Sequence, residues 1–429
     1  MAPQAGSLVG HTDTMTGRFN KSFTQQEAIP EAAIEAAVAV LRSGQLHRYS
    51  DASDNAGPTA LLEQRFAQYL DLPFALACAS GGYALSIALH AAGVEPGDQV
   101  LCNGFTLAPV AGALHSVAAA PVWVETTPGL TIDLDHLAHC ARTSEARFLL
   151  MSCMRGHMPD MERLLQICDE QDICLVEDCA HTLGAAWDGR RSGTFGSVAC
   201  FSTQTYKHIN SGEGGLLATS DPDIMAKAIL YSGSYMLYDR HRAAPEPAAF
   251  EPYIYTTPNY SGRMDHLRAA VLLPQLEQLD ANIERWNRRY RIIEAILASS
   301  SAVALEPRST REFYVGSSIQ FRLPTWSARG ITSLRDRCSQ RGVVLKWFGE
   351  ERPRGYTSRY DHWQFFAPES EATNPPEAAL LPQTTEILST LLDMRIPLTF
   401  SEADCERVAT IIAEEIHLAT SATEQPHGR

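Results

Sequence analysis

Short apolar runs alternate with helical patterns between residues 75 and 219. Continuous apolar strands that alternate with helices are typical of a largely parallel sheet covered on both faces, whose ligands bind at the carboxyl ends of its strands. The pattern therefore predicts an α/β protein with a large, mostly parallel seven-stranded sheet. The predicted strands are Ala75–Ala79, Gln99–Cys102, Pro121–Val124, Phe148–Ser152, Ile173–Glu177, Val198–Ser202 and Gly215–Thr219. The predicted helices between them are Gly82–Ala92, Ala108–Ala118, Leu134–Arg142 and Asp160–Gln171.

A smaller α+β pattern follows. One long helix is predicted over Met264–Ser299. Strands are then predicted at Tyr314–Leu323 and Val343–Trp347, and helices at Ala328–Arg341 and Glu402–His417. The segment Glu350–Pro382, rich in Pro, Arg and aromatic residues, predicts a loop. Near the start of the chain, Glu31–Ser43 has the pattern of an amphipathic helix, which we expect to pack onto the smaller domain.

These elements predict a division into domains. We expect a flexible tail over residues 1–22, an N-terminal helix and arm over 23–58, a large α/β domain over 59–262, a connecting helix over 263–300, a small C-terminal α+β domain over 301–420, and a tail over 421–429. The chain has 429 residues, 45% of them hydrophobic and 20% charged, which is enough for one large domain and a smaller one.

Charge and cysteine content narrow the functional classes. The net charge of −15 excludes a general attraction for nucleic acid or anionic membranes, although a local basic site for an anionic substrate remains possible. The ten cysteines are spread along the chain without metal-binding spacing, so we expect reduced thiols and no metal site. Residues 1–20 lack the apolar core of a signal peptide, and no apolar run could span a bilayer, so we expect a cytoplasmic protein.

Lys207 is the first candidate for chemistry. A lone lysine is usually a solvated surface charge, but this one lies between two strands that are predicted to be buried, where an unpaired ammonium group is costly. A Schiff base with an aldehyde cofactor would explain a lysine in that position.

Three further motifs resemble parts of a cofactor site. Gly81 and Gly82 follow a strand and open a helix, where backbone N–H groups favour an anion, although such turns are also common for packing reasons. Ser202 precedes Lys207 and has a hydroxyl that can bind phosphate. Asn259 lies in a turn before the long helix, where it would ordinarily be a cap or turn residue.

Asp178 is a carboxylate at the end of a very apolar strand, where it must be paired. It is either a capping residue or the group that keeps a pyridine nitrogen protonated, as the chemistry of pyridoxal phosphate (PLP) demands. His181 follows it and either hydrogen-bonds the cofactor phenolate or is a buried histidine with protein partners.

The joint order of these motifs on an α/β framework resembles the DegT/StrS family of aminotransferases, which includes nucleotide-sugar aminotransferases. That family has the fold-type-I architecture of PLP-dependent transferases. The resemblance extends from about Phe23 to His417. The segments that carry it are Leu41–Gly44, Ser80–Leu85, Glu95–Asp98, Phe105-Thr106, Glu177–His181, Gly193–Gly196, Phe201–Gly215 and Asn259–Ala270.

The resemblance implies catalytic roles for three residues. Lys207 would form the Schiff base with PLP and move protons during the reaction. Asp178 would pair with the pyridine nitrogen, and His181 would lie near the ring hydroxyl.

The resemblance also implies a phosphate site and an assembly. Ser202 and the backbone of Gly81 and Gly82 would hold the cofactor phosphate. Asn259 would reach the phosphate of the neighbouring subunit's cofactor, which implies a homodimer with shared active sites.

The chain departs from the family pattern at several positions. Leu107 stands where the family has an aromatic residue that stacks on the cofactor ring, so only an apolar contact is kept. Arg155 and His157 replace a His-Leu-Tyr-Gly-like turn, and Arg155 is either a clamp for an anion or a structural arginine. Ser261 and Gly262 interrupt the usual Asn-Tyr-Arg-Met run.

A second arginine-rich segment, Arg352–Trp363, contains Arg359 and Tyr360. It is either a solvated loop or a second contact for an anionic substrate. Together with Arg155 and His157, these residues favour an amino acid or other small carboxylate over a nucleotide sugar.

The leading hypothesis is a cytosolic, homodimeric, PLP-dependent aminotransferase of a biosynthetic pathway. A PLP enzyme of the same fold that eliminates, cyclises or forms carbon–carbon bonds is the first alternative, because the cofactor carries the difficult chemistry. A catalytically retired regulatory or binding protein is the second, and the intact Lys207, Asp178 and Ser202 argue against it.

Overall fold

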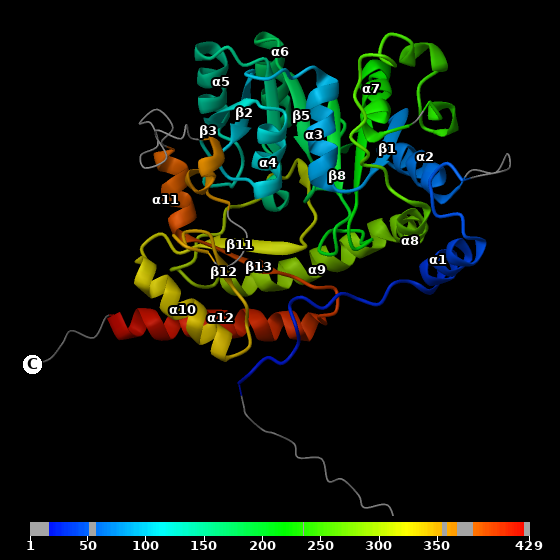
Figure 1. Ribbon diagram of the computed structural model, residues 1–429. Coiled ribbons are helices and arrows are strands. Elements are labelled where there is room, and N and C mark those ends of the chain that lie inside the picture. Colours follow the sequence, from blue (N-terminus) through cyan, green and yellow to red (C-terminus); the bar gives the residue numbers. More distant parts are fainter. Residues whose placement is uncertain (1–16, 51–56, 235, 354–357, 367–380, 424–429) are drawn as a thin grey trace, which may run out of the picture.

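The computed structural model describes residues 17–50, 57–234, 236–353, 358–366 and 381–423 (Figure 1). Its larger part, here called the large lobe, is a seven-stranded sheet of order β1-β9-β8-β5-β4-β2-β3 with its flanking helices. The strands are β1 (Phe74–Cys78), β2 (Gln99–Asn103), β3 (Ala120–Val124), β4 (Phe148–Ser152), β5 (Cys174–Asp178), β8 (Val198–Ser202) and β9 (Gly215–Thr219). Only β9 runs antiparallel to its neighbours. The prediction of a mostly parallel seven-stranded sheet is confirmed.

Helices cover both faces of this sheet. One face packs on α2 (Pro58–Leu70), α5 (Leu134–Thr143), α6 (Met161–Glu170) and α8 (His266–Glu277). The other packs on α3 (Gly81–Ala92), α4 (Ala108–Ser116) and α7 (Pro222–Ser232). Because both faces are buried, the strands need apolar side chains in both directions, which explains their continuous apolar runs. Helices α3, α5, α6 and α7 begin after side-chain caps, at Ser80, Asp133, Asp160 and Asp221.

The connecting helix differs from its prediction. Instead of one helix over Met264–Ser299, the chain forms α8 and then α9 (Leu279–Leu297). Gln278, at φ −94° and ψ −4°, ends the first helix and opens the second. The apolar pattern continues across this bend, and the sequence signal near it is Pro274, a helix-breaking residue four positions before Gln278.

The N-terminal helix was predicted with the right bounds, as α1 (Glu31–Ser43), but on the wrong partner. It packs along α8 rather than onto the smaller domain (Figure 1). Gly44 ends the helix in the left-handed conformation (φ 70°), and the backbone N–H of His266 then donates to the carbonyl of Leu46 at 2.9 Å. This hydrogen bond ties the end of α1 to the start of α8.

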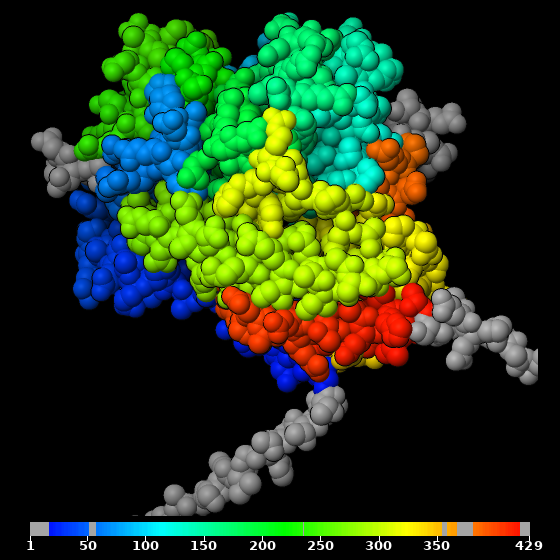
Figure 2. Space-filling model, turned by 180° about the vertical axis from the view of Figure 1, so that it is seen from behind, coloured from blue at the N-terminus to red at the C-terminus, as the bar shows by residue number. Residues whose placement is uncertain are grey.

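The remaining elements form a small lobe around a second sheet, β11 (Ser318–Arg322), β13 (Leu391–Arg395) and β12 (Lys346–Trp347). Its core is shared with α9, α10 (Ala328–Gln340) and α12 (Glu402–Thr423). Figure 2 shows α8 and α9 as a yellow-green band between the large lobe and the red α12. The predicted strands at Tyr314–Leu323 and Val343–Trp347 are shorter than expected. The central strand β13 and the preceding α11 (Pro382–Thr390) were not predicted.

Short elements complete the described chain. A third sheet consists of β6 (Ala186–Trp187), β7 (Arg190–Arg191) and β10 (Glu312–Phe313). Turns of 3-10 helix occur at Met154–Gly156, Tyr238–Arg240, Pro247–Phe250, Tyr360–His362 and Gln364–Phe366. The last two lie in the predicted loop Glu350–Pro382, of which residues 354–357 and 367–380 fall outside the described residues.

The predicted tails are wrong where the structure describes them. Phe19 is buried, and its ring lies 4.9 Å from that of Phe400, so residues 17–22 pack on the small lobe. At the other end, α12 continues to Thr423. Residues 1–16 and 424–429 lie outside the described residues.

Three further observations concern the described residues. None of their helices is long and apolar enough to cross a membrane. All ten cysteines are free thiols. No cluster of three metal-ligating side chains occurs in these ranges.

Candidate active site

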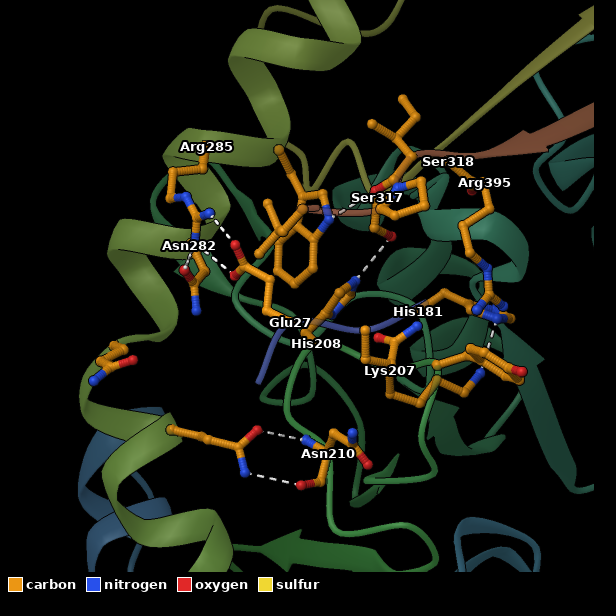
Figure 3. Close-up of a pocket in the computed structure, with 18 of the residues that line it drawn as sticks. Glu27, His181, Lys207, His208, Asn210, Asn282, Arg285, Ser317, Ser318 and Arg395 are labelled. Atoms are coloured by element: carbon orange, nitrogen blue, oxygen red, sulfur yellow. Dashed lines mark hydrogen bonds and ion pairs between the residues drawn. The ribbon is translucent and has the colours of Figure 1, made fainter. Parts of the chain in front are cut away.

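A pocket lies between the two lobes, at the carboxyl ends of the central strands (Figure 3). From the large lobe it is lined by Arg155 after β4, His181 after β5, and Tyr206–His208 after β8. The small lobe and α9 contribute Asn282, Arg285, Trp286, Ser317, Ser318 and Arg395–Leu398, and the segment Gln26–Pro30 crosses the rim. The position agrees with the sequence-based expectation that ligands bind at the carboxyl ends of the strands.

Lys207 lies in a turn between β8 and β9 and lines this pocket. Its backbone N–H donates to the carbonyl of Gln204 at 2.8 Å, and its Nζ lies 2.8 Å from Nε2 of His181. Burial lowers the pKa of Lys207 from 10.5 to about 7, against the opposing charge of Asp178. The amine of Lys207 is therefore available in its neutral, nucleophilic form near neutral pH.

His181 is held in one orientation by the turn that follows β4. The backbone N–H of Arg155 points to Nδ1 of His181 at 3.3 Å. Burial, assisted by the charges of Lys207 and Arg155, lowers the pKa of His181 well below its ordinary value. A neutral ring that accepts at Nδ1 carries its proton on Nε2, so His181 donates to Lys207.

Asp178 ends β5 and is buried beside Ser152, the last residue of the adjacent β4. The Ser152 hydroxyl donates to Oδ2 of Asp178 at 2.8 Å, and the backbone N–H of Ala180 donates to Oδ1 at 3.1 Å. Asn103 at the end of β2 accepts from the Ser152 N–H and donates to its carbonyl. Burial raises the pKa of Asp178, so a cationic partner at this carboxylate would be strongly favoured. Sequence reasoning missed Ser152 and Asn103.

Gly81 and Ser202 form a cradle for an anion. A Cβ atom on Gly81 would lie 2.9 Å from the Cβ of Ser202, so only glycine allows this close approach. The Ser80 hydroxyl accepts from the N–H of Tyr83 and caps α3, whose first residue, Gly81, is the one that approaches Ser202. A helix N-terminus and a hydroxyl together suit a phosphate.

These groups fit PLP. The neutral amine of Lys207 matches its aldehyde, the carboxylate of Asp178 its pyridine nitrogen, and the cradle its phosphate. In addition, the hydroxyl of Thr106 is buried without a hydrogen-bond partner among the described residues, as expected for a group that awaits a ligand.

Of the two predicted substrate residues in the turn after β4, one lines the pocket and the other does not. Arg155 lines the pocket at φ 58°, but its guanidinium forms a 2.9 Å ion pair with Asp393 of β13. Nε2 of His157, which is half-buried, lies 2.8 Å from Oε1 of Gln320. Leu107 packs against the apolar cluster that contains Phe105, Met154 and Phe348.

Arg155, His181 and Lys207 are the predicted site residues that line this pocket. Those that do not line it are Gly81, Gly82, Leu107, His157, Asp178, Ser202, Asn259, Arg359 and Tyr360. Arg359 forms two hydrogen bonds with Asp361, at 3.0 and 2.6 Å. The Tyr360 hydroxyl accepts from the backbone N–H of Leu381. Asn259 is exposed, and its side-chain oxygen accepts from the N–H and hydroxyl of Ser261.

The structure adds pocket residues that sequence reasoning missed. The Cζ of Arg395 lies 3.8 Å from the centre of the Tyr206 ring. Arg285 of α9 forms a 2.9 Å ion pair with Glu27 at the rim. The sequence signal that could have found Arg395 is a charged residue at the end of an apolar run. The same kind of signal singled out Asp178.

Comparison with known protein families matches residues 27–342 to the DegT/DnrJ/EryC1/StrS aminotransferase family. The chain belongs to this family. The resemblance drawn from the sequence motifs is thereby confirmed, and PLP is the cofactor of such enzymes.

Individual relatives show how far the likeness extends. The chain is 32% identical over 222 residues to GDP-perosamine synthase of Caulobacter vibrioides, a match that covers 52% of this chain and 57% of that protein. It is 28% identical over 334 residues to 3-amino-5-hydroxybenzoate synthase of Amycolatopsis mediterranei, which covers 77% and 82% of the two chains. A crystal structure of 3-amino-5-hydroxybenzoic acid synthase superposes with a TM-score of 0.76 at 24% identity, over 92% of this chain and 99% of that one. The fold is therefore that of fold-type-I PLP-dependent transferases.

Proposed function

We propose that this protein is a PLP-dependent aminotransferase that moves an amino group between an amino-acid donor and a keto substrate in a cytoplasmic biosynthetic pathway. The observation that carries the proposal is the convergence of Lys207, Asp178 and the Gly81–Ser202 cradle at one edge of the sheet. Membership of the family supports it.

Each residue has a physical role in this reaction. Bound PLP would supply an electron-withdrawing ring that stabilises negative charge on the substrate carbon. Nζ of Lys207, whose pKa burial lowers to about 7, would take a proton from that carbon and return it. His181 would orient Nζ through its 2.8 Å contact. Asp178 would keep a proton on the ring nitrogen, since it is buried and lacks a cationic partner among the described ion pairs.

A small carboxylate is the proposed class of substrate. The names of these relatives refer both to a nucleotide sugar and to a small aromatic carboxylate, so the family admits the second class. Arg155, Arg285 and Arg395 line the pocket in a chain whose net charge is −15, the first two as partners of Asp393 and Glu27. Guanidinium groups favour carboxylates.

The active form is proposed to be a homodimer in which Asn259 serves the partner's site. In support, Asn259 is exposed and is not among the residues lining the pocket of its own chain. It adjoins the exposed Tyr260, whose ring stacks on Tyr231 with centroids 5.5 Å apart. Exposed aromatic rings of this kind are enriched at interfaces.

Subunit mixing would test this assembly. Lys207→Ala and Asn259→Ala chains are inactive or weak alone, but a mixed dimer contains one site with both native residues. Co-expression should therefore restore activity to roughly a quarter of wild type, whereas a site complete within one chain would give none of this recovery.

The test of the reaction follows the absorbance of bound PLP while amino acids and amino sugars are screened. An amino donor should convert the cofactor to pyridoxamine phosphate, and a keto acid should restore it. Lys207→Ala should keep its fold by circular dichroism, lose the absorbance band that borohydride abolishes, and show no multiple turnover. If product forms without pyridoxamine phosphate, the reaction is an elimination, a cyclisation or a carbon–carbon bond formation and not a transamination.

A further inference from the structure

The turn that follows β4, Met154–Gly156, has a strained backbone. Arg155 lies at φ 58° and ψ 19°, in the left-handed region that residues other than glycine seldom adopt. Gly156 follows at φ 81°, and a Cβ atom at that position would lie 3.0 Å from the carbonyl oxygen of His181. A backbone of this kind persists only where surrounding contacts hold it.

The turn fixes the state of His181. The N–H of Arg155 points to Nδ1 of His181 at 3.3 Å, and Nε2 of the same ring lies 2.8 Å from Nζ of Lys207 (Figure 3). Because Nδ1 accepts this hydrogen bond, the neutral ring carries its hydrogen on Nε2 and presents it to Nζ. An N–H aimed at Nζ suits a neutral amine, which has a lone pair, and disfavours an ammonium group, which has none.

Arg308, in the segment between α9 and β10, holds the turn by its backbone. Its Nη1 donates to the carbonyl of Gly156 at 2.7 Å and to Glu312 at 3.0 Å. Its Cζ lies 5.6 Å and 4.6 Å from the ring centres of Tyr290 and Tyr314, and its side chain is 6% exposed. A guanidinium enclosed in this way has little freedom, so it fixes the position of the Gly156 carbonyl.

Gln320 of β11 ties the same turn to the small sheet. Its Oε1 lies 2.8 Å from Nε2 of His157, and its Nε2 donates to Oδ1 of Asp393 at 2.7 Å. Oδ2 of Asp393 pairs with the guanidinium of Arg155 at 2.9 Å. These contacts form a closed loop that leaves the chain at His157 and returns to it at Arg155. The two residues on either side of Gly156 are thereby held against the small lobe.

From these contacts we propose that Arg308 and Gln320 are positioning residues. They hold the turn after β4 in its strained form, so that the N–H of Arg155 keeps the ring of His181 with its hydrogen aimed at Lys207. The inference rests on the proposed function, in which Lys207 reacts as a neutral amine. It also gives the small lobe a route to that amine, because neither positioning residue lies on the large sheet.

The direction of the effect on Lys207 follows from the hydrogen bond. When the turn is released, His181 is free to carry its hydrogen on Nδ1 and to accept from the ammonium group of Lys207 through Nε2. That bond stabilises the charged form and raises the pKa of Lys207.

Neither positioning residue acts on Lys207 by a charge of its own. Among the described residues, the groups whose charge or hydrogen bond involves this amine are Asp178, His181, Arg155, His208 and Arg395. Arg308 is not one of them, and Gln320 is neutral. A shift in the pKa of Lys207 on their loss therefore reports the position of His181 and not the removal of a charge.

The chain allows a direct measurement because it has four lysines, Lys21, Lys207, Lys227 and Lys346. The full-length protein, freed of PLP, is labelled with isotopic lysine and titrated by NMR, and each signal is assigned by a single lysine-to-arginine variant. In the wild type, Lys207 should titrate with a midpoint near pH 7. In Arg308→Gln and in Gln320→Leu the midpoint should rise by about one pH unit, the size expected from one hydrogen bond to a charged group. In Arg308→Lys, which keeps a donor and the charge, it should rise by less.

A buried arginine away from the turn provides the matched control. Arg289 is buried and donates to backbone carbonyls, those of Phe400 at 2.6 Å and Arg285 at 2.8 Å. Arg289→Gln should therefore cost stability in the same way as Arg308→Gln but leave the midpoint of Lys207 where it is. An equal rise in Arg289→Gln would overturn the proposal.

A second control asks whether the effect passes through His181. In a His181→Ala background, Arg308→Gln should cause no further shift, because the ring that changes its hydrogen has been removed. A full shift in that background contradicts the proposal. Arg308→Gln and Gln320→Leu reach the turn by different contacts, so either one decides the question if the other fails to fold by circular dichroism.

The titration separates this inference from the proposed function, since it needs neither PLP nor turnover. A raised midpoint of Lys207 in the two variants supports the inference even where no amino donor converts PLP in the loaded protein. An unchanged midpoint contradicts the inference alone. Failure of every donor contradicts the aminotransferase proposal alone.

Discussion

The candidate site has two sides, here called the cofactor wall on the large lobe and the substrate wall on the small lobe, and they are built in different ways. In the large lobe, Asp178 and Ser202 end interior strands of a seven-stranded sheet, and the N-terminus of α3 lies beside them. Neighbouring strands hold their backbone on both sides. In the small lobe, Arg395 ends the middle strand of a three-stranded sheet, and the wall is joined to the rest by side-chain ion pairs.

This difference matches the two tasks of the pocket. The cofactor is the same throughout the family, and the groups proposed to hold it lie on the rigid part. The substrate is particular to the chain, and the residues proposed to meet it lie on the smaller lobe and its connections. A wall made of side-chain pairs can change its specificity without disturbing the large sheet.

The largest effect is expected on the cofactor wall, from Asp178→Asn. The neutral amide cannot hold a proton on the cofactor ring nitrogen, so kcat should fall by about 10³-fold while PLP is retained less tightly. The measurement is the steady-state rate at saturating PLP, with Ser152→Ala as the milder control, since it removes only one hydrogen bond to the same carboxylate. Near-normal kinetics for Asp178→Asn would contradict the role assigned to it.

The next largest effect is expected from the ion pair of Arg155 with Asp393, which joins the two walls. It should appear as a change in the free energy of unfolding. In Asp393→Asn the guanidinium of Arg155 loses the carboxylate with which it pairs. The pair is buried, since the side chains of Arg155 and Asp393 are 10% and 6% exposed. Unfolding in urea should show a loss of about 3 kcal/mol. The matched control is Glu27→Gln, because the pair of Glu27 with Arg285 is exposed and should contribute less than about 1 kcal/mol. Equal losses in the two variants would remove the distinction between the pairs.

The same contrast explains what the sequence could predict. The strands of the large sheet are buried on both faces, so their apolar runs are unbroken. These runs predicted the bounds of each strand to within one residue. Strand β13 is interrupted by the charge of Asp393 and was missed. Because that strand was not predicted, the sequence placed Arg395 in no element. A charged residue at the end of an apolar run had nevertheless singled out Asp178.

The contacts between the lobes could not be predicted for a related reason. The ion pair of Arg155 with Asp393, and the packing of α1 on α8, join segments far apart in the chain. Hydrophobic periodicity describes which face of an element is buried but not which element covers it. Arg155 therefore stayed undecided between clamp and structural residue until the position of Asp393 was known.

A pH dependence is expected at Lys207, on the cofactor wall. With a pKa of about 7, the neutral amine rises about tenfold between pH 6 and pH 8. The rate at which cofactor-free protein captures PLP, followed by stopped-flow absorbance, should rise with a midpoint near pH 7. A midpoint near the ordinary value of 10.5 would show that Nζ is solvated.

The same pKa shift affects stability. The unfolded chain keeps this lysine protonated up to about pH 10.5, so between pH 7 and 10.5 it binds more protons than the folded chain. The cofactor-free protein should therefore gain stability as the pH rises through that window. Lys346, whose pKa burial also lowers to about 7, contributes in the same direction. Lys207→Ala and Lys346→Met should each remove part of the slope.

The smallest effect is expected from Arg359→Gln. Arg359 donates two hydrogen bonds to its own neighbour Asp361 and is not among the residues that line the pocket of its chain. Its loss should leave kcat/KM within about twofold for the best amino donor, because such local, partly exposed pairs contribute little. A loss of tenfold or more in Arg359→Gln would mean that the arginine reaches the pocket of a partner subunit, and the substrate wall would then be shared between chains as the phosphate contact of Asn259 is proposed to be.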